Sequence, residues 1–532
     1  MGSDEKKPTP ENGTLLQGYE WNALGDGKHY ERLTGALKDL KGIGISNIWL
    51  PPGCKASSPE GVGYDIYDLY DLGEFDQKGT TRTKWGSKEE LLNLSKKGKE
   101  LGVGLYWDAV LNHKAAADKK EKVKVVEVDE SDRNKVTSGE QEIQAWVGFD
   151  FPGRGDKYSK QKYHWYHFSG VDYDAATGKK AIFRIQGENK GWSESVDDEQ
   201  GNADFMMFAD LDYSHEEVEN DVKNWGAWIT KEVGLKGFRL DAVQHFSGRF
   251  TKEWVDYIRK ESGEDVFIVG EFWVGEVKTM TDWLAEMNRE FSLYDSPLLY
   301  NFSNAGKQEK SDLRKVFDNT LVKAEPVNAV TVVMNHDTQP GQTVETPIEG
   351  FFKPLAYSLI LLRSEGYPCV FYGDLYGMLG RDGENGGVPS EPPACGGKLP
   401  DLCLARNLYA YGEQNDYFDE ANLVGFVRRG THDRPDGLAC IMSNAEPGKI
   451  RMFVGEEHKG ETWTDVLEWE KTEVKIGDDG FGEFCCPGTS VAVFVNKDAQ
   501  GRDRFPVGFD SDIYKGAQKK EKKEDEQGNT AL

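Results

Sequence analysis

The chain has 532 residues, of which 38% are hydrophobic and 12% aromatic, and its formal net charge is −27 at pH 7. This length allows several domains and a large apolar core. Such an excess of carboxylates repels polyanions, so we expect no nucleic acid and no membrane surface among its partners, whereas a neutral polymer is compatible. No segment approaches the roughly 18 consecutive apolar residues that a membrane-spanning helix needs.

The N-terminal segment and the cysteines indicate the cellular compartment of the protein. Residues 1–13 (MGSDEKKPTPENG) are polar and contain neither the basic nor the apolar region of a secretory signal. Seven cysteines are irregularly spaced, and two of them, Cys485 and Cys486, are adjacent. An odd number in this arrangement favours reduced thiols over a disulfide framework. We therefore expect a cytoplasmic protein.

Short apolar segments alternate with amphipathic segments along most of the chain. This alternation predicts strands connected by helices, which is typical of a parallel (β/α)₈ barrel, or TIM barrel. The predicted strands are residues 14–21, 45–51, 103–110, 237–241, 266–271, 291–295, 329–334 and 368–372. The predicted helices are residues 30–40, 87–101, 216–233, 250–261, 277–290, 311–322 and 352–363.

Two regions depart from this alternation. The interval between the third and fourth predicted strands is far longer than one crossover helix needs, and its aromatic run YHWYHFSGVDYD predicts an inserted β-rich domain. After residue 410, short strand-like runs between turn residues predict a C-terminal antiparallel β-sandwich. The predicted parts are a polar N-terminal segment 1–13, the barrel in 14–113 and 215–410, the inserted domain in 114–214, the C-terminal domain in 411–496, and a charged, partly disordered tail in 497–532.

Three carboxylates follow predicted barrel strands, where catalytic groups of such barrels lie. The fourth strand runs GFRLDAVQH, with Arg239 and Asp241; the fifth ends GEFW, with Glu271; and the seventh ends MNHD, with Asp337. A single acid at such a position is more often a helix cap or a surface charge. Three of them, accompanied by an arginine and histidines, favour a catalytic site.

This set suits glycoside hydrolysis with retention of configuration. The reaction needs a carboxylate that attacks the anomeric carbon and a protonated carboxyl group, about 5–5.5 Å away, that protonates the leaving oxygen. An arginine beside the nucleophile keeps it ionised. Aromatic neighbours such as Phe272 and Trp273 can desolvate the acid and raise its pKa. The 14 Trp and 22 Tyr fit either a large core or a cleft that stacks sugars.

These segments resemble the α-amylase family of glycoside hydrolases. DAVLNH, GFRLDAVQH, GEFW and VVMNHD look like its four signature regions, in order. GYDIYDLYDLGEFDQKGTTRTKWGS, FDFPGRGDKYS, KYHWYHFSG and GYPCVFYGDLYG look like its bacterial liquefying subgroup. The likeness covers residues 14–496. It implies a barrel with a B domain inserted after strand three and a C-terminal β domain, and an enzyme that cuts internal α-1,4 bonds of starch, glycogen and maltooligosaccharides. We expect a monomer.

The resemblance also assigns roles to residues of this chain. It implies that Asp241 is the nucleophile, that Glu271 is the general acid/base, and that Asp337 grips sugar hydroxyls and stabilises the transition state. The residues implied to contact the sugar are Arg239, His113, His245, His336, Tyr64, Trp21, Gln17 and Gln244. It implies one structural Ca²⁺ between the barrel and the B domain, held by side chains of Asn112, Asp204 and Asp210 and by the carbonyl of His245.

The metal region departs from the subgroup pattern. Ser169, Ser193 and Ser214 stand where the subgroup has acids of a larger metal cluster, whereas Asp212 is retained. The loss of three charges weakens the binding of several cations. We therefore expect one calcium ion and not the full cluster.

A second departure from the subgroup pattern leaves open whether water or another sugar receives the glycosyl group. Gln244, three residues after Asp241, stands where the subgroup has a lysine, and it can donate only as a neutral amide. A 4-α-glucanotransferase, in which an acceptor sugar replaces water, is therefore an alternative function. A non-catalytic glucan-binding protein is a second alternative, although all three carboxylates are present.

Overall fold

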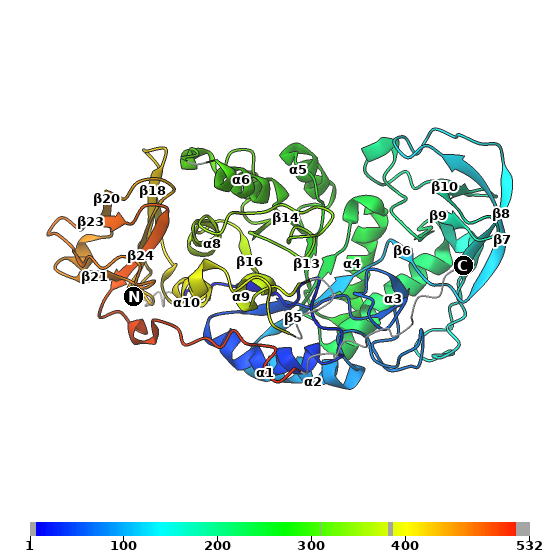
Figure 1. Cartoon of the computed structure of the whole chain (residues 1–532), viewed down its shortest axis with the longest axis horizontal. Coiled ribbons are helices and arrows are strands. Elements are labelled where there is room, and N and C mark those ends of the chain that lie inside the picture. Colours follow the sequence, from blue (N-terminus) through cyan, green and yellow to red (C-terminus); the bar gives the residue numbers. More distant parts are fainter. Residues whose placement is uncertain (1–6, 309, 381–386, 518–532) are drawn as a thin grey trace, which may run out of the picture.

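A closed barrel of eight parallel strands forms the centre of the molecule (Figure 1). The structure is a computed structural model, and it describes residues 7–308, 310–380 and 387–517. The barrel strands are β1 (Leu15–Gln17), β2 (Asn47–Trp49), β5 (Gly104–Ala109), β12 (Gly237–Leu240), β13 (Phe267–Gly270), β14 (Ser292–Tyr294), β15 (Ala329–Val332) and β16 (Tyr367–Phe371). Each overlaps one predicted strand, so the predicted (β/α)₈ barrel is confirmed.

The register of three neighbouring strands brings the predicted catalytic groups together. Arg239 of β12 pairs with Asp108 of β5 on one side and with Val269 of β13 on the other. Because all three strands run in the same direction, the residues that follow β12 and β13 leave the barrel at the same end. Asp241 and Glu271 are the first residues after these two strands.

Helices cover the outside of the barrel. Six of them overlap the predicted helices: α1 (His29–Gly42), α2 (Lys88–Leu101), α3 (Glu216–Val233), α4 (Gly248–Ser262), α5 (Val277–Glu286) and α8 (Lys353–Leu362). Helix α2 begins with a capping box between Ser87 and Glu90 and ends at Gly102, which has a left-handed φ of 71°. Two further helices, α9 (Tyr372–Tyr376) and α10 (Leu399–Tyr409), follow the last barrel strand.

The predicted helix at 311–322 is wrong. That stretch contains a 3₁₀ turn (Leu313–Lys315) and only the beginning of the short helix α7 (Leu321–Ala324). The long helix of this unit is α6 (Ser296–Lys307), which starts directly after β14. Asp295 caps it by accepting the Leu298 N–H at 3.0 Å, and Pro297 lies in its first turn. An N-cap aspartate followed by a proline marks the start of a helix, but the prediction used only the spacing of apolar residues.

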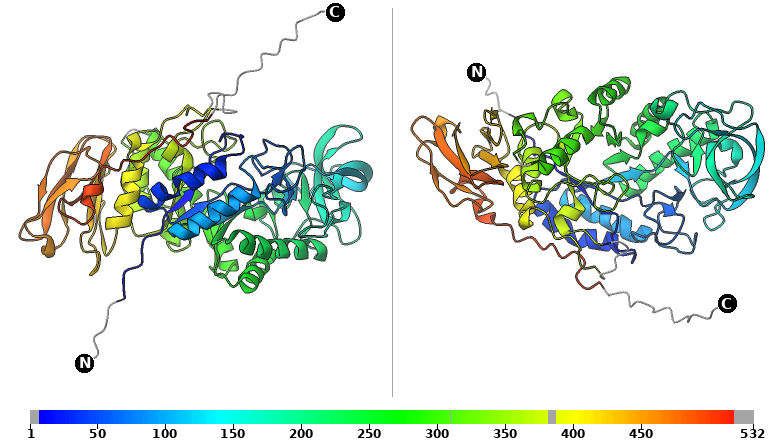
Figure 2. Two further views of the ribbon diagram at one scale, coloured as in Figure 1. Left: turned by 90° about the horizontal axis from the view of Figure 1, so that it is seen from below. Right: turned by 45° about the horizontal axis from the view of Figure 1, so that its top comes forward.

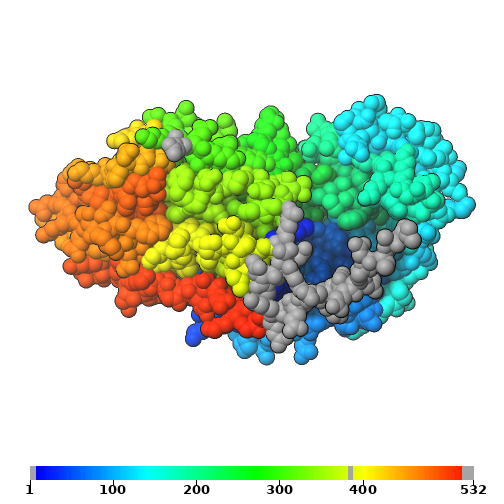
Figure 3. Space-filling model, viewed as in Figure 1, coloured from blue at the N-terminus to red at the C-terminus, as the bar shows by residue number. Residues whose placement is uncertain are grey.

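The segment inserted after β5 forms a six-stranded antiparallel sheet at one end of the molecule, which confirms the expected β-rich insertion (cyan to blue-green in Figure 3). Its order is β6-β11-β9-β10-β7-β8. The strands are β6 (His113–Lys114), β7 (Lys119–Val128), β8 (Gln141–Gly148), β9 (Phe168–Asp174), β10 (Lys179–Ile185) and β11 (Ala209–Leu211).

The C-terminal strands form a β-sandwich at the opposite end, as expected. One sheet has six strands, in the order β17 (Gln414–Tyr417), β18 (Leu423–Arg428), β19 (Leu438–Ser443), β24 (Ser490–Asn496), β21 (Thr462–Asp465) and β22 (Val474–Lys475). The other pairs β20 (Gly448–Phe453) with β23 (Phe481–Cys486). Met452 and Phe484 of the second sheet share an apolar core with Phe494 of the first. A separate small sheet pairs β3 (Lys55–Ala56) with β4 (Ile66–Asp68).

The chain after β24 runs back along the barrel (red in Figure 2). The Val507 N–H donates to Asp401 at 3.0 Å, and the ring of Tyr514 lies 5.2 Å from the guanidinium of Arg32. Residues up to 517 thus pack against helices, and the expected disorder of the tail's tip falls on 518–532, outside the described residues. Within the described ranges, none of the helices combines the length and hydropathy that crossing a bilayer requires.

Candidate active site

Arg239 lies at the centre of a buried group of carboxylates at the carboxyl ends of β5, β12 and β13. Its Nη1 donates to Oδ1 of Asp108 at 2.8 Å and to Oδ1 of Asp241 at 2.7 Å. Its Nη2 donates to Oε2 of Glu271 at 2.6 Å. The arginine side chain is only 1% exposed. One guanidinium therefore orients both carboxyl groups that the sequence analysis proposed as nucleophile and acid.

The protonation of this group follows from its burial. Burial raises the pKa of Asp241, the Arg239 charge opposes this, and the neighbouring Glu271 charge adds to it. The net effect is an Asp241 pKa above that of an isolated aspartate. Oε2 of Glu271 also accepts the Ala242 N–H at 3.1 Å. Ala242 has a left-handed φ of 47°, a strained conformation for a residue with a side chain.

Asp108 was not among the predicted site residues, but the structure places it against the same arginine. Its Oδ2 accepts hydrogen bonds from Tyr19 at 3.0 Å, from Tyr64 at 2.9 Å and from Trp49 Nε1 at 2.9 Å. With Arg239 on Oδ1, the carboxylate is fully satisfied. The available signal was an acid inside the apolar strand sequence GLYWDA, where a buried charge requires a partner.

Three flat rings form one wall of the site. The rings of Tyr64 and His336 are parallel within 2°, with centroids 5.1 Å apart. Trp21 is parallel to Tyr64 within 3° at 6.0 Å, and to His336 within 4° at 6.1 Å. A pyranose ring presents a flat apolar face, so this wall can stack a sugar. The structure thus brings together three of the residues predicted to contact it.

Several predicted sugar contacts are neutral groups with free hydrogen-bonding atoms. Burial lowers the pKa of His336 to about 3 and that of His113 to about 4, so both rings are uncharged at neutral pH. Gln17 Nε2 donates to His336 Nδ1 at 3.0 Å, and His113 Nε2 lies 2.7 Å from the Tyr64 carbonyl oxygen. The buried atoms that find no partner in the part of the chain described include Gln17 Oε1, His113 Nδ1, His336 Nε2 and Gln244 Oε1. Buried polar atoms are normally satisfied, so these four are available to sugar hydroxyls.

Asp337 lies beside this wall. Burial raises its pKa to about 6, while the Arg239 charge acts in the opposite direction. Its Oδ2 lies 3.2 Å from His336 Nε2. A carboxyl group that titrates near neutrality can accept or donate a hydrogen bond to a sugar hydroxyl.

The predicted calcium ligands come from both the barrel and the inserted domain. Asn112 follows β5, Asp210 lies on β11, and Nδ2 of Asn112 lies 3.0 Å from Oδ1 of Asp210. Burial raises the pKa of Asp204 to about 7 and raises that of Asp210, which also feels the charge of Asp204. A cation between two such buried carboxylates would offset their mutual repulsion, and an all-oxygen donor set suits Ca²⁺. The residues therefore fit the ion, with the Asn112 amide turned to present its oxygen.

His245 was predicted twice, as a sugar contact and through its carbonyl as a calcium ligand. It ends the 3₁₀ turn Val243–His245 that follows β12. Its Nδ1 lies 2.5 Å from the Ala203 carbonyl, next to Asp204. The ring thus fixes the loop that carries Asp204, and both predicted roles remain predictions.

A second group of possible metal ligands lies on the inserted domain. His167, His215 and Glu217 have ligand atoms within 4.8 Å of one another. The His164 N–H donates to Nδ1 of His167 at 2.9 Å, which leaves the ring proton on Nε2, and Nε2 faces Glu217 at 2.9 Å. A protonated nitrogen has no lone pair for a metal. This arrangement is therefore a histidine–carboxylate hydrogen bond.

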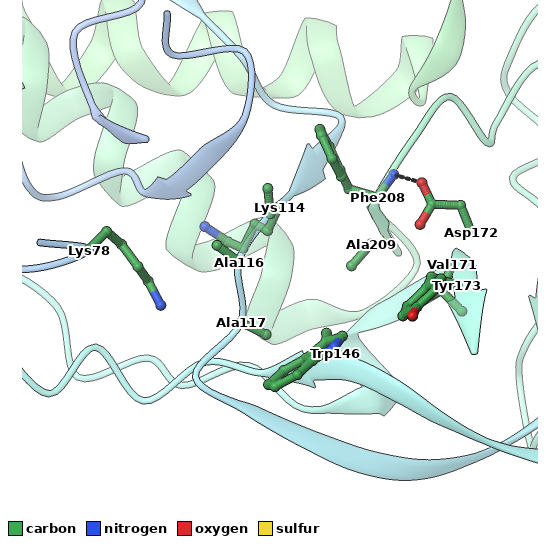
Figure 4. A pocket seen from close by; sticks show the side chains of 11 residues that line it. Lys78, Lys114, Ala116, Ala117, Trp146, Val171, Asp172, Tyr173, Phe208 and Ala209 are labelled. Carbon is green, nitrogen blue, oxygen red and sulfur yellow. Dashed lines mark hydrogen bonds between the residues drawn. The ribbon is translucent and has the colours of Figure 1, made fainter. Parts of the chain in front are cut away.

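A pocket of about 400 Å³ opens on the inserted domain close to the site (Figure 4). Trp146, Tyr173 and Phe208 line it, and these residues are 44%, 37% and 36% exposed. The Phe208 ring lies 5.5 Å from that of His113, so the pocket adjoins the predicted sugar contacts. These three aromatic residues were not among the predicted site residues.

Comparison with known proteins decides the family. Residues 25–392 match the family model for the catalytic domain of α-amylases. The chain belongs to the α-amylase family. It is therefore a glycoside hydrolase, which confirms the resemblance inferred from its motifs.

Relatives match nearly the whole chain. It is 44% identical to a glucan 1,4-alpha-maltohexaosidase of Bacillus sp. (strain 707), over 91% of this chain and 93% of the relative. It is 44% identical to an α-amylase of Bacillus licheniformis, over 91% and 94%. It is 39% identical to a cytoplasmic α-amylase of Escherichia coli (strain K12), over 91% and 99%. The solved α-amylase of Geobacillus thermoleovorans shares the fold, with a TM-score of 0.61 and 17% identity over 91% of this chain and 98% of that one.

Proposed function

We propose that the protein is an α-amylase that hydrolyses internal α-1,4-glucosidic bonds of starch, glycogen and maltooligosaccharides with retention of configuration. The observation that carries the proposal is the pair of hydrogen bonds from Arg239 to Asp241 and Glu271, at 2.7 and 2.6 Å. A retaining glycosidase needs two carboxyl groups that flank one bond. Membership of the α-amylase family supplies the type of bond.

The residues then divide the reaction as follows. Asp241 attacks the anomeric carbon while Glu271 transfers its proton to the glycosidic oxygen, and the leaving chain departs with a free hydroxyl. Glu271, now ionised, takes a proton from water. The resulting hydroxide displaces Asp241 from the anomeric carbon and restores both carboxyl groups. Asp337 and His336 hold hydroxyls of the sugar that becomes attached to Asp241.

The aromatic surfaces suggest how a long glucan lies on the protein. The wall of Trp21, Tyr64 and His336 stacks the sugar at the cut, with Gln17, His113 and His245 as polar contacts. The pocket lined by Trp146 and Phe208 lies next to His113. We propose that the chain continues into this pocket, which allows cleavage away from the ends.

A calcium ion, a compartment and an oligomeric state complete the proposal. One Ca²⁺ is bound by Asn112, Asp204, Asp210 and the carbonyl of His245. The seven cysteines are free, and one relative is named a cytoplasmic α-amylase, which supports a cytoplasmic location. We propose that the protein acts as a monomer, which light scattering at working concentration tests.

A 4-α-glucanotransferase is the second candidate, because of Gln244. Its side chain is 8% exposed, and Oε1 has no partner among the described residues, at a position that faces the leaving or acceptor sugar in this proposal. A neutral amide there can donate a hydrogen bond to an acceptor sugar, whereas the lysine of the subgroup donates as a cation.

Incubation with maltoheptaose separates the candidates. Hydrolysis produces one new reducing end for each bond cut, whereas transfer produces longer chains with no net gain of reducing ends. The Gln244→Lys variant is the matched comparison, because it restores the cation of the subgroup. Retention on a glucan affinity gel without any turnover would indicate the non-catalytic alternative.

A further inference from the structure

Lys190 places a buried ammonium group next to the proposed calcium site. Its side chain is 5% exposed. Nζ donates to Oδ2 of Asp212 at 2.5 Å, to the carbonyl of Tyr166 at 2.5 Å and to the carbonyl of Phe168 at 3.2 Å. An ammonium group has three donors, and all three are used. The lysine thus ends in a cage of oxygen atoms, as a bound cation does.

The cage is continuous with the carboxylates proposed to bind calcium. Asp212 is two residues beyond Asp210 and is 7% exposed. Asp204 and Asp210 are buried as well, at 4% and 1% exposed. The three aspartates therefore form one group of buried acids, and Lys190 contacts the member farthest along the chain.

Serines complete this cluster as neutral donors. The Ser169 hydroxyl donates to Asp210, the Ser193 N–H to Asp204 at 3.0 Å, and the Ser214 hydroxyl to Asp212 at 2.5 Å. None of the serines adds a charge. Three aspartates and one lysine leave a net charge of −2, which one divalent cation neutralises. A second divalent cation would leave the buried cluster with excess positive charge.

We infer that Lys190 is a built-in counter-cation that fills the position of a second metal ion at Asp212 and limits the cluster to one calcium. This rests on the proposed calcium site. Lys190 lies between β10 and β11, in the same connection as Ser193 and Asp204. Its side chain keeps one positive charge in the cluster when calcium is removed, and it links this connection to the backbone around the start of β9.

The test measures calcium content and thermal stability of the full-length protein, with Ca²⁺ as the only added metal. We expect the wild type to bind one Ca²⁺ per chain. Lys190→Met should melt lower than the wild type by roughly 3 °C or more in excess chelator. At millimolar calcium Lys190→Met should bind a second Ca²⁺ and regain most of the lost melting temperature, because the ion replaces the missing charge. Lys190→Arg keeps the charge and should bind one Ca²⁺ per chain.

Two controls separate the possible failures. Lys180→Met removes an exposed lysine from β10 of the same domain and should change neither quantity. If Lys190→Met binds one Ca²⁺ at every concentration, or if its loss of stability is independent of calcium, the inference about Lys190 is wrong. If the wild type binds no Ca²⁺, the proposed calcium site itself is wrong. Should Lys190→Met not fold, Lys190→Gln removes the same charge but keeps an amide donor for the Phe168 carbonyl. It should bind two Ca²⁺ at millimolar calcium, and a content that stays at one overturns the inference.

Discussion

Asp241 and Glu271 accept hydrogen bonds from different nitrogens of the same guanidinium, that of Arg239, at 2.7 and 2.6 Å. The arginine is itself fixed by Asp108 on the neighbouring strand. The relative position of the two carboxyl groups is thus set by the barrel and does not depend on a mobile loop. Preorganisation of this kind lowers the cost of reaching the transition state.

Glu271→Gln tests the proposed general acid/base. Glutamine keeps the shape of the side chain and can still accept the Arg239 hydrogen bond, but it cannot give a proton to the leaving oxygen. We expect a loss of about 10²- to 10⁴-fold in kcat on soluble starch, with binding of maltoheptaose retained. Reducing-end release and calorimetry measure the two quantities.

The control for this variant is Glu264→Gln, which changes an exposed glutamate paired with Lys236. It should leave kcat unchanged. Asp241→Asn should lose activity to at least the same degree as Glu271→Gln, because no covalent intermediate forms. A Glu271→Gln enzyme with near-full activity would remove Glu271 from the proposed mechanism.

Asp108→Asn tests the positioning of Arg239. The amide keeps the volume but removes a charge that is 1% exposed and bonded to Arg239, Tyr19, Tyr64 and Trp49. Breaking such a buried pair costs about 3–5 kcal/mol. We expect a lower melting temperature, a fall in kcat and a shifted pH profile, since Arg239 then turns toward the remaining acids. If only stability falls while kcat and the pH profile stay the same, Asp108 has no positioning role.

The barrel could be predicted from sequence because its strands are short apolar runs between amphipathic helices. All eight strands were located, even β14, which has only three residues. The helix after it was predicted at the wrong place, because the spacing of apolar residues does not show its start clearly. Its start is set by the Asp295 cap and by Pro297, which such spacing does not reveal.

The candidate site could be predicted only in part. Asp241, Glu271 and Asp337 follow strands in recognisable motifs, and the structure places them around Arg239 and His336. Asp108 and Lys190 were missed because their importance comes from partners distant in sequence: Asp108 bonds Arg239 across 131 positions. No local pattern distinguishes a buried lysine from an exposed one.

Two substitutions at Tyr64 separate its ring from its hydroxyl. Tyr64→Phe removes the hydrogen bond to Asp108 but keeps the ring parallel to His336. Tyr64→Ala removes the stacking surface as well. We expect the alanine variant to lose kcat/KM on maltoheptaose by about tenfold more than the phenylalanine variant, which corresponds to about 1.4 kcal/mol. Equal losses would show that the hydroxyl, and not the ring, is what matters.

Buried histidines make the stability of the protein depend on pH. Burial lowers the pKa of His29 to about 4, and its Nε2 lies 2.7 Å from the Gly18 carbonyl. His113 and His167 are lowered to about 4 as well, and His336 to about 3. Below pH 6.5 the unfolded chain binds protons that the folded chain does not. The stabilising contribution is therefore complete above pH 6.5 and is lost as the pH falls toward 4.

The size of this pH effect on the free energy of unfolding follows from the pKa shift. For His29 the loss of stability between pH 6.5 and 4 is about 3 kcal/mol, since each pKa unit corresponds to about 1.4 kcal/mol. His29→Gln keeps a donor for the Gly18 carbonyl but cannot titrate. The free energy of unfolding in urea, measured from pH 7 to 4.5 in saturating calcium, should fall less steeply for His29→Gln than for the wild type. The exposed His432→Gln should keep the wild-type slope, and an unchanged slope in His29→Gln would mean that His29 is protonated in the folded protein.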